Sequence, residues 1–134
     1  MNMPKTYMKE NMKTSVRFQT VVGTVSGYEL EGKQGASLSD FVETLKTLAA
    51  KVQDETGIYV SGSVVPTSVY YRTEWGCPEG GENAFLVQGD LNPEFGEEGP
   101  WKESVLRLCD ELKKFYNQST LTVTFSVVDH CYLK

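Results

Sequence analysis

Two arginines and nearby aromatic residues are of the types that bind a planar anion. Arg17 falls in one segment of alternating polarity, and Tyr70, Arg72, Glu74 and Trp75 fall in another. A guanidinium group presents a planar fork of donors that matches a carboxylate or a phosphate, and an aromatic ring adds a stacking surface. We therefore predict that these residues form a ligand-binding site.

The alternation between residues 69 and 75 decides which of these side chains point outward. A half-buried strand turns its more apolar set of side chains toward the core. That set is Val69, Tyr71, Thr73 and Trp75. We expect Arg72 to project from the opposite face, together with Arg17. The alternatives are a solvated face, on which Arg72 pairs with cross-strand neighbours, and a face through which the protein associates with itself.

Residues 75–82 (WGCPEGGE) form a glycine-rich loop. Glycines let backbone N–H groups approach an anion, but no lysine and no helix follows, so this is not a phosphate-binding P-loop. Glu79 and Glu82 would also repel an anion. We predict a hairpin turn in which Trp75 packs against the protein. A flap over a pocket and a contact loop between subunits are the alternatives.

Nucleophilic catalysis and metal binding have few candidates in this sequence. The chain has three cysteines and one histidine, so Cys77 and His130 form the thiol–imidazole pair to consider. A four-ligand zinc site would need all of these residues together. The odd number and wide spacing of the cysteines are typical of free thiols in a reducing cytoplasm, with Cys109 packed in the core and Cys77 exposed. We expect no catalytic residue of this kind, no metal and no cofactor.

An acidic cluster precedes the second expected helix and consists of Glu94, Glu97, Glu98 and Glu103. Such a cluster could hold a metal ion or supply an acid and a base. The helix dipole also stabilises acidic residues at this position. The cluster therefore needs no functional explanation.

The composition limits the partners that this protein can have. The chain has 134 residues, a formal net charge of −5 and no cluster of lysines and arginines. A protein that binds duplex nucleic acid or an anionic membrane uses such clusters to neutralise phosphates, so we expect neither partner. The sequence has no hydrophobic leader and no run of about 18 apolar residues. These features predict a cytoplasmic protein.

Hydrophobic periodicity predicts four strands and two helices. Strands are expected at 14–30, 58–75, 84–89 and 120–128, where β-branched residues alternate with polar ones, and residues 69–89 have the pattern of a hairpin. The first helix should span 37–57, with Ser37 as its N-cap and Gly57 at its end. The second should start at Pro100 and stop at residues 117–119.

These elements fit one domain with one core. We expect residues 14–134 to form a single α+β domain behind a mobile arm of residues 1–13. The side chains predicted to be buried are Leu45, Leu48, Leu108, Leu112, Val123 and Phe125.

The predicted element order, β-α-β-β-α-β, resembles the ferredoxin-like class, in which two helices cover one face of an antiparallel sheet. That order occurs in enzymes, binding modules and assembly proteins, so it does not decide the function. Because groups common in catalysis are scarce, we predict a non-catalytic homo-oligomeric protein that binds a small anionic ligand (a nucleotide or an acidic metabolite) or a protein partner. A phage or mobile element could encode such a protein for sequestration. The alternatives are a small ferredoxin-like enzyme, with its site between the sheet and the loops, and a structural assembly protein.

Overall fold

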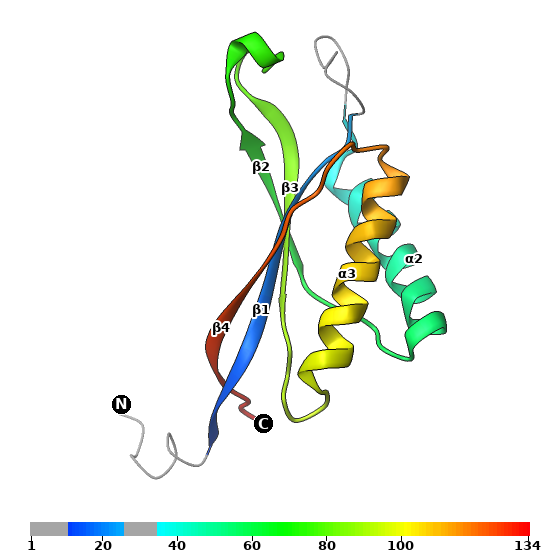
Figure 1. Ribbon diagram of the computed structural model, residues 1–134, viewed down its shortest axis with the longest axis vertical. Coiled ribbons are helices and arrows are strands. Elements are labelled where there is room, and N and C mark those ends of the chain that lie inside the picture. Colours follow the sequence, from blue (N-terminus) through cyan, green and yellow to red (C-terminus); the bar gives the residue numbers. More distant parts are fainter. Residues whose placement is uncertain (1–10, 26–34) are drawn as a thin grey trace.

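The computed structural model describes residues 11–25 and 35–134 of the chain. The elements are β1 (Met12–Gly23), α2 (Leu38–Thr56), β2 (Ser63–Val69), the short 3-10 helix η1 (Thr73–Trp75), β3 (Glu82–Asp90), α3 (Glu98–Phe115) and β4 (Val123–Cys131) (Figure 1). This order confirms the predicted α+β, ferredoxin-like class. None of the described helices is long and apolar enough to cross a membrane.

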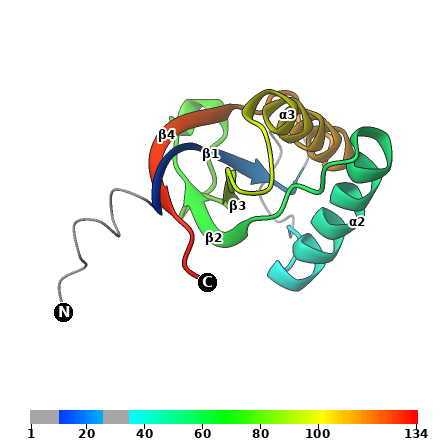
Figure 2. The same ribbon diagram turned by 90° about the horizontal axis from the view of Figure 1, so that it is seen from below.

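The four strands form one antiparallel sheet in the order β2-β3-β1-β4. The long strand β1 is central and pairs with β3 on one side and β4 on the other. Both helices lie against the same face of this sheet, and the other face is open (Figure 2). The fold therefore has two layers, with a core between the helices and the sheet.

Alternation along the strands separates the helix-covered face from the open face. In β1, Val16, Phe18 and Val22 are buried toward the helices, whereas Arg17 and Gln19 lie on the open face. Residues that pair directly across antiparallel strands share a face. The predicted outward position of Arg17 on the first strand is therefore confirmed.

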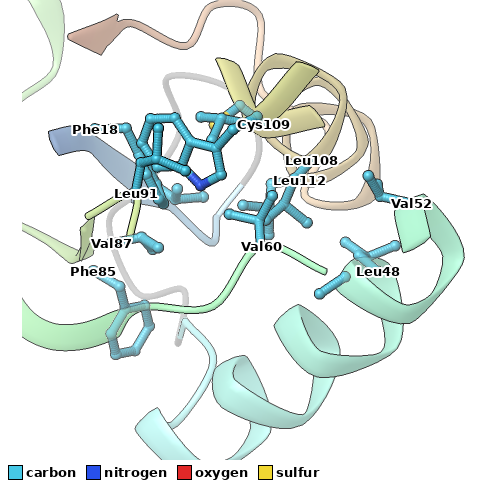
Figure 3. Close-up of a cluster of buried hydrophobic side chains, with 14 of the residues drawn as sticks. Phe18, Leu48, Val52, Val60, Phe85, Val87, Leu91, Leu108, Cys109 and Leu112 are labelled. Atoms are coloured by element: carbon cyan, nitrogen blue, oxygen red, sulfur yellow. The ribbon is translucent and has the colours of Figure 1, made fainter. Parts of the chain in front are cut away.

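The core is built from aromatic contacts and aliphatic side chains of both helices. The Phe18 and Trp101 rings meet edge to face with centroids 5.9 Å apart, and the Phe41 and Phe85 rings stack with centroids 4.4 Å apart. Figure 3 shows Leu48 of α2 close to the side chains that α3 contributes. Contacts of this kind hold the helices on the sheet.

Half of the predicted core residues are buried. Leu48, Leu108 and Leu112 are buried. Leu45, Val123 and Phe125 are partly buried and pack against the edge of the core. The two β4 residues are less buried than predicted because β4 lies at the edge of the sheet. It has a neighbouring strand on one side only, and its other side is open.

The first helix begins and ends where the sequence predicts. Ser37 Oγ accepts a hydrogen bond from Asp40 N at 3.1 Å, and Gly57 adopts the left-handed conformation with φ 82°. The second helix starts two residues before the predicted Pro100, at Glu98. Pro100 remains in the first turn, where its missing N–H costs nothing.

The predicted strand at 58–75 is wrong in extent. β2 spans only Ser63–Val69, and it contains Pro66 because it is an edge strand. After Val69 the chain leaves the sheet, and Trp75 N donates a 2.9 Å hydrogen bond to Arg72 O in the 3-10 turn. Arg72 therefore does not lie on a strand.

Other predicted boundaries also differ from the structure: β4, predicted at 120–128, spans Val123–Cys131. β1 ends at Gly23, and the rest of the predicted strand at 14–30 lies mainly outside the described residues. Of the predicted arm at 1–13, residues 1–10 also lie outside them, whereas Met12 and Lys13 begin β1.

Candidate functional site

The open face carries a cavity of about 630 Å³ at the end of the sheet where β1 and β2 end and β3 and β4 begin. This volume is in the range of sites for small molecules. Four separate stretches of the chain line the cavity: the end of β1, the end of β2 with Tyr71, the start of β3, and the connection from α3 to β4. Side chains far apart in the sequence therefore converge on one site.

The cavity is lined by both apolar and polar side chains. Val21, Val69 and Leu86 contribute aliphatic surface. At the margin, Gln19 Nε2 donates to Gln88 Oε1 at 2.9 Å across β1 and β3. A surface that mixes aliphatic and polar groups suits a partly polar small molecule.

Glu82 places a carboxylate in the cavity. It is the first residue of β3 and pairs with Val69, so its side chain belongs to the open face. Within the described parts of the chain, no ion pair involves Glu82. Its negative charge is therefore available to a cationic ligand.

Arg17 lies on the open face as predicted, but at the opposite end of the sheet. Its Nε donates to Asp90 Oδ1 at 2.7 Å and its Nη2 to Asp90 Oδ2 at 3.1 Å. This hydrogen bonding raises the pKa of Arg17 above its ordinary value. Asp90 is the last residue of β3 and Glu82 the first, a separation of about 26 Å along an extended strand. Arg17 is thus remote from the cavity.

The predicted site residues of the 69–75 segment lie at the tip of the hairpin between β2 and β3, and not on the sheet. Tyr70 is 91% exposed, and Glu74 is also exposed. Arg72 Cζ lies 5.5 Å from the centroid of the Trp75 ring. Trp75 is itself 61% exposed, so the expectation that it packs down is wrong. A ligand-binding role of these residues stays a prediction, but the structure does not bring them to Arg17.

The phase predicted for residues 69–75 is reversed where the strand still exists. Val69 pairs with Glu82 and lines the open-face cavity, as does Tyr71. The apolar set turns away from the helices because the helices do not cover this end of the edge strand. Apolar side chains here form the wall of a cavity instead of a core.

The remaining candidates stay apart. Cys77 lies in the connection between β2 and β3, whereas His130 pairs with Lys13 at the other end of the sheet, so the thiol–imidazole pair does not form. Cys109 is buried, and burial raises the pKa of its thiol to about 12. In the described ranges, no group of His, Cys, Asp and Glu residues could hold a metal ion.

The fold and the cavity define an α+β protein of ferredoxin-like topology with a cavity on its open sheet face. A family model described as SAM lyase matches residues 12–134. The chain therefore belongs to the SAM lyase family.

Two solved structures are similar to this chain. One is a phage SAM lyase in complex with S-methyl-5'-thioadenosine, with 17% identity, a TM-score of 0.60, and coverage of 88% of this chain and 90% of that one. The other is a phage SAM lyase in the apo state, with 16% identity, a TM-score of 0.54, and coverage of 90% of both chains. At these identities they support the fold alone. The comparison with curated proteins gave no match.

Family membership corrects the functional prediction. The chain belongs to a family of enzymes, so both the predicted non-catalytic binding role and the leaning against an enzyme are wrong. The alternative of a small enzyme with a ferredoxin-like fold agrees with this finding. Scarce histidines and absent motifs exclude only reactions that need them. From the sequence we considered Glu82 only as a residue that repels anions, whereas the structure places it in the lining of the cavity.

Proposed function

We propose that this protein cleaves S-adenosylmethionine and releases S-methyl-5'-thioadenosine. The observation that carries the proposal is the family match over residues 12–134. The open-face cavity, with its apolar walls and the carboxylate of Glu82, supports it.

The proposed reaction needs no cofactor or water. The sulfur–Cγ bond of the substrate breaks, and its electron pair goes to sulfur, which becomes the neutral thioether of S-methyl-5'-thioadenosine. A carboxylate oxygen of the same substrate molecule forms the new bond to Cγ and closes a five-membered lactone. All atoms and charges balance within one substrate molecule. Such a reaction requires no histidine, metal or protein nucleophile.

The cavity has the properties that favour this step. A positive sulfonium and a negative carboxylate neutralise each other as the bond forms, so a site with fewer water molecules lowers the barrier relative to bulk water. The apolar walls formed by Val21, Val69 and Leu86 supply such surroundings. The carboxylate reaches Cγ only when the substrate is folded, a conformation that is rare in solution. Binding the substrate in this folded conformation also speeds the reaction.

Charge complementarity favours a cation over the anion that the arginines suggest. The substrate carries a sulfonium, an ammonium and a carboxylate, and its net charge is positive. The chain has a formal net charge of −5, and Glu82 lies in the cavity. We therefore assign Glu82 to attraction of the cationic substrate, and Arg17 has no part in it.

The test is an incubation of the purified protein with S-adenosylmethionine in water enriched in oxygen-18, followed by mass spectrometry. We expect S-methyl-5'-thioadenosine in equal amount to a lactone that contains no oxygen-18 at early times. A labelled amino-acid product would mean that water attacks the substrate. Absence of both products would refute the proposed function.

Self-association and a cytoplasmic location remain proposals. Tyr70 and Trp75 leave two large aromatic side chains exposed at the hairpin tip, which suits a contact between copies of the chain. The three cysteines are free thiols, as expected in a reducing compartment. The mass of the protein in solution tests the first proposal, because a monomer at all concentrations would exclude a homo-oligomer.

A further inference from the structure

Gln118 is held rigidly at the C-terminus of α3. Its backbone N–H donates to Lys113 O at 2.9 Å, and the N–H of Asn117 donates to Lys114 O at 3.1 Å. Asn117 has the positive φ of 50° that this type of helix ending requires. The helix end therefore fixes the backbone from which the Gln118 side chain extends.

The amide group of Gln118 has one orientation. Its Nε2 donates to Val25 O at 2.9 Å and to Tyr116 O at 3.1 Å, which uses both of its protons. With the nitrogen committed to these two carbonyls, Oε1 points to the other side, toward the end of β1. Gln118 lines the cavity, so this oxygen is an acceptor at a fixed place in its wall.

Two side-chain oxygens meet above Gly23. A methyl group on Gly23 would lie 2.5 Å from Glu82 Oε1 and 3.1 Å from Gln118 Oε1. Gly23 is not among the described residues with positive φ, so its backbone conformation does not require glycine. Glycine is needed here for space, because any side chain would push the two oxygens away.

Resting on the proposed function, we propose that Glu82 Oε1 and Gln118 Oε1 form the subsite for the sulfonium of the substrate. A carboxylate oxygen and an amide oxygen together attract a compact positive charge more strongly than either alone. The attraction weakens when the sulfur becomes neutral in the product. Gln118 is thus a specificity-determining residue that distinguishes the charged substrate from uncharged thioethers.

The expected effects on KM and kcat depend on the stage of the reaction at which the sulfur is positively charged. The positive charge is complete in the bound substrate and diminishes in the transition state. Loss of Gln118 Oε1 therefore weakens binding of the substrate more than it slows the chemical step. A residue that only supported the fold would not produce this separation between KM and kcat.

The first experiment compares Gln118→Met with Gln53→Met, which makes the same chemical change at an exposed position on α2. The ligands are S-adenosylmethionine and S-adenosylhomocysteine, which differ by the methyl group that makes the sulfur positive. For Gln118→Met we expect KM for S-adenosylmethionine to rise about tenfold, while kcat and the inhibition constant of S-adenosylhomocysteine change less than about threefold. Gln53→Met should behave as the wild type. Equal weakening of both ligands would overturn the assignment to the sulfonium.

The variant Gly23→Ala tests the subsite by displacing the two oxygens without removing either of them. Its methyl group displaces the side-chain ends of Glu82 and Gln118 but leaves the backbone unstrained, so the Tm should stay within about 4 °C of the wild type. We expect the same selective loss of S-adenosylmethionine binding. If the wild-type protein does not cleave S-adenosylmethionine, the proposed function fails. If it does, and both variants match it, the subsite alone is refuted.

Discussion

The two faces of the sheet use the same strands for different purposes. On the helix-covered face of β1, Phe18 and Val22 are buried in the core. On the open face of the same strand, Val21 and Gly23 line a cavity. Residues one position apart therefore belong to the core or to the lining of the cavity, according to what covers them.

The open face itself is divided. At one end, Arg17 and Asp90 neutralise each other through two hydrogen bonds. At the other end, Glu82 has no ion pair with any residue that the structure describes. A charge that is already paired has little interaction left for a ligand. The unpaired carboxylate of Glu82 can therefore interact with a ligand more strongly than the paired guanidinium of Arg17.

The largest expected effect is on the helix-covered face. Leu112 is completely buried between α3 and the sheet. Leu112→Ala should lower the free energy of unfolding by about 2–5 kcal/mol, because it removes buried methyl groups and leaves a cavity. Denaturant unfolding measures this loss, and kcat of the folded fraction should not change. A cost below about 1 kcal/mol would mean that α3 does not pack on the sheet in this way.

The next effect tests the functional end of the open face. Glu82→Gln keeps the size of the side chain and removes its charge. We expect kcat/KM for S-adenosylmethionine to fall about 100-fold, mainly through KM, with an almost unchanged Tm. Steady-state kinetics and thermal unfolding of the same preparation measure both quantities. Full activity in this variant would remove Glu82 from the site.

A smaller effect compares a core thiol with a loop thiol. Burial raises the pKa of Cys109 to about 12, so its thiol stays protonated at pH 8. Cys77 is only partly buried. Cys77 should therefore react with iodoacetamide at least about tenfold faster than Cys109. Peptide mass spectrometry after timed labelling gives both rates, and equal rates would contradict the burial of Cys109.

The smallest expected effect on stability and activity is that of breaking the ion pair between Arg17 and Asp90 on the open face. Arg17→Ala breaks an exposed ion pair with Asp90 and opens no cavity in the core. We expect the Tm to fall by less than about 4 °C and kcat/KM to change less than about twofold. A large loss of activity would restore the anion-binding hypothesis for this arginine.

The fold could be predicted from the sequence because its signals are local. Ser37 and Gly57 mark the ends of α2, and regular alternation from Val16 to Val22 fixes the faces of β1. The 69–75 segment was predicted wrongly because alternation shows which side chains share a face of the strand. It does not show which of the two faces the helices cover. At the end of an edge strand, the apolar set can line a cavity instead of a core.

The candidate site could not be predicted because no local motif contains it. Gly23, Tyr71, Glu82 and Gln118 lie in four separate segments, which only the pairing of β1 with β3 and the turn after α3 bring together. The proposed reaction also uses the substrate's own carboxylate as nucleophile. The usual markers of an enzyme are therefore not required in the sequence.

A crystal structure of the wild-type protein with S-methyl-5'-thioadenosine tests the central claim most directly. We predict that the nucleoside lies against Val21 and Leu86 in the open-face cavity, with its sulfur beside the oxygens of Glu82 and Gln118 above Gly23. A nucleoside bound at Arg17 and Asp90, or anywhere else outside the cavity, would contradict the account.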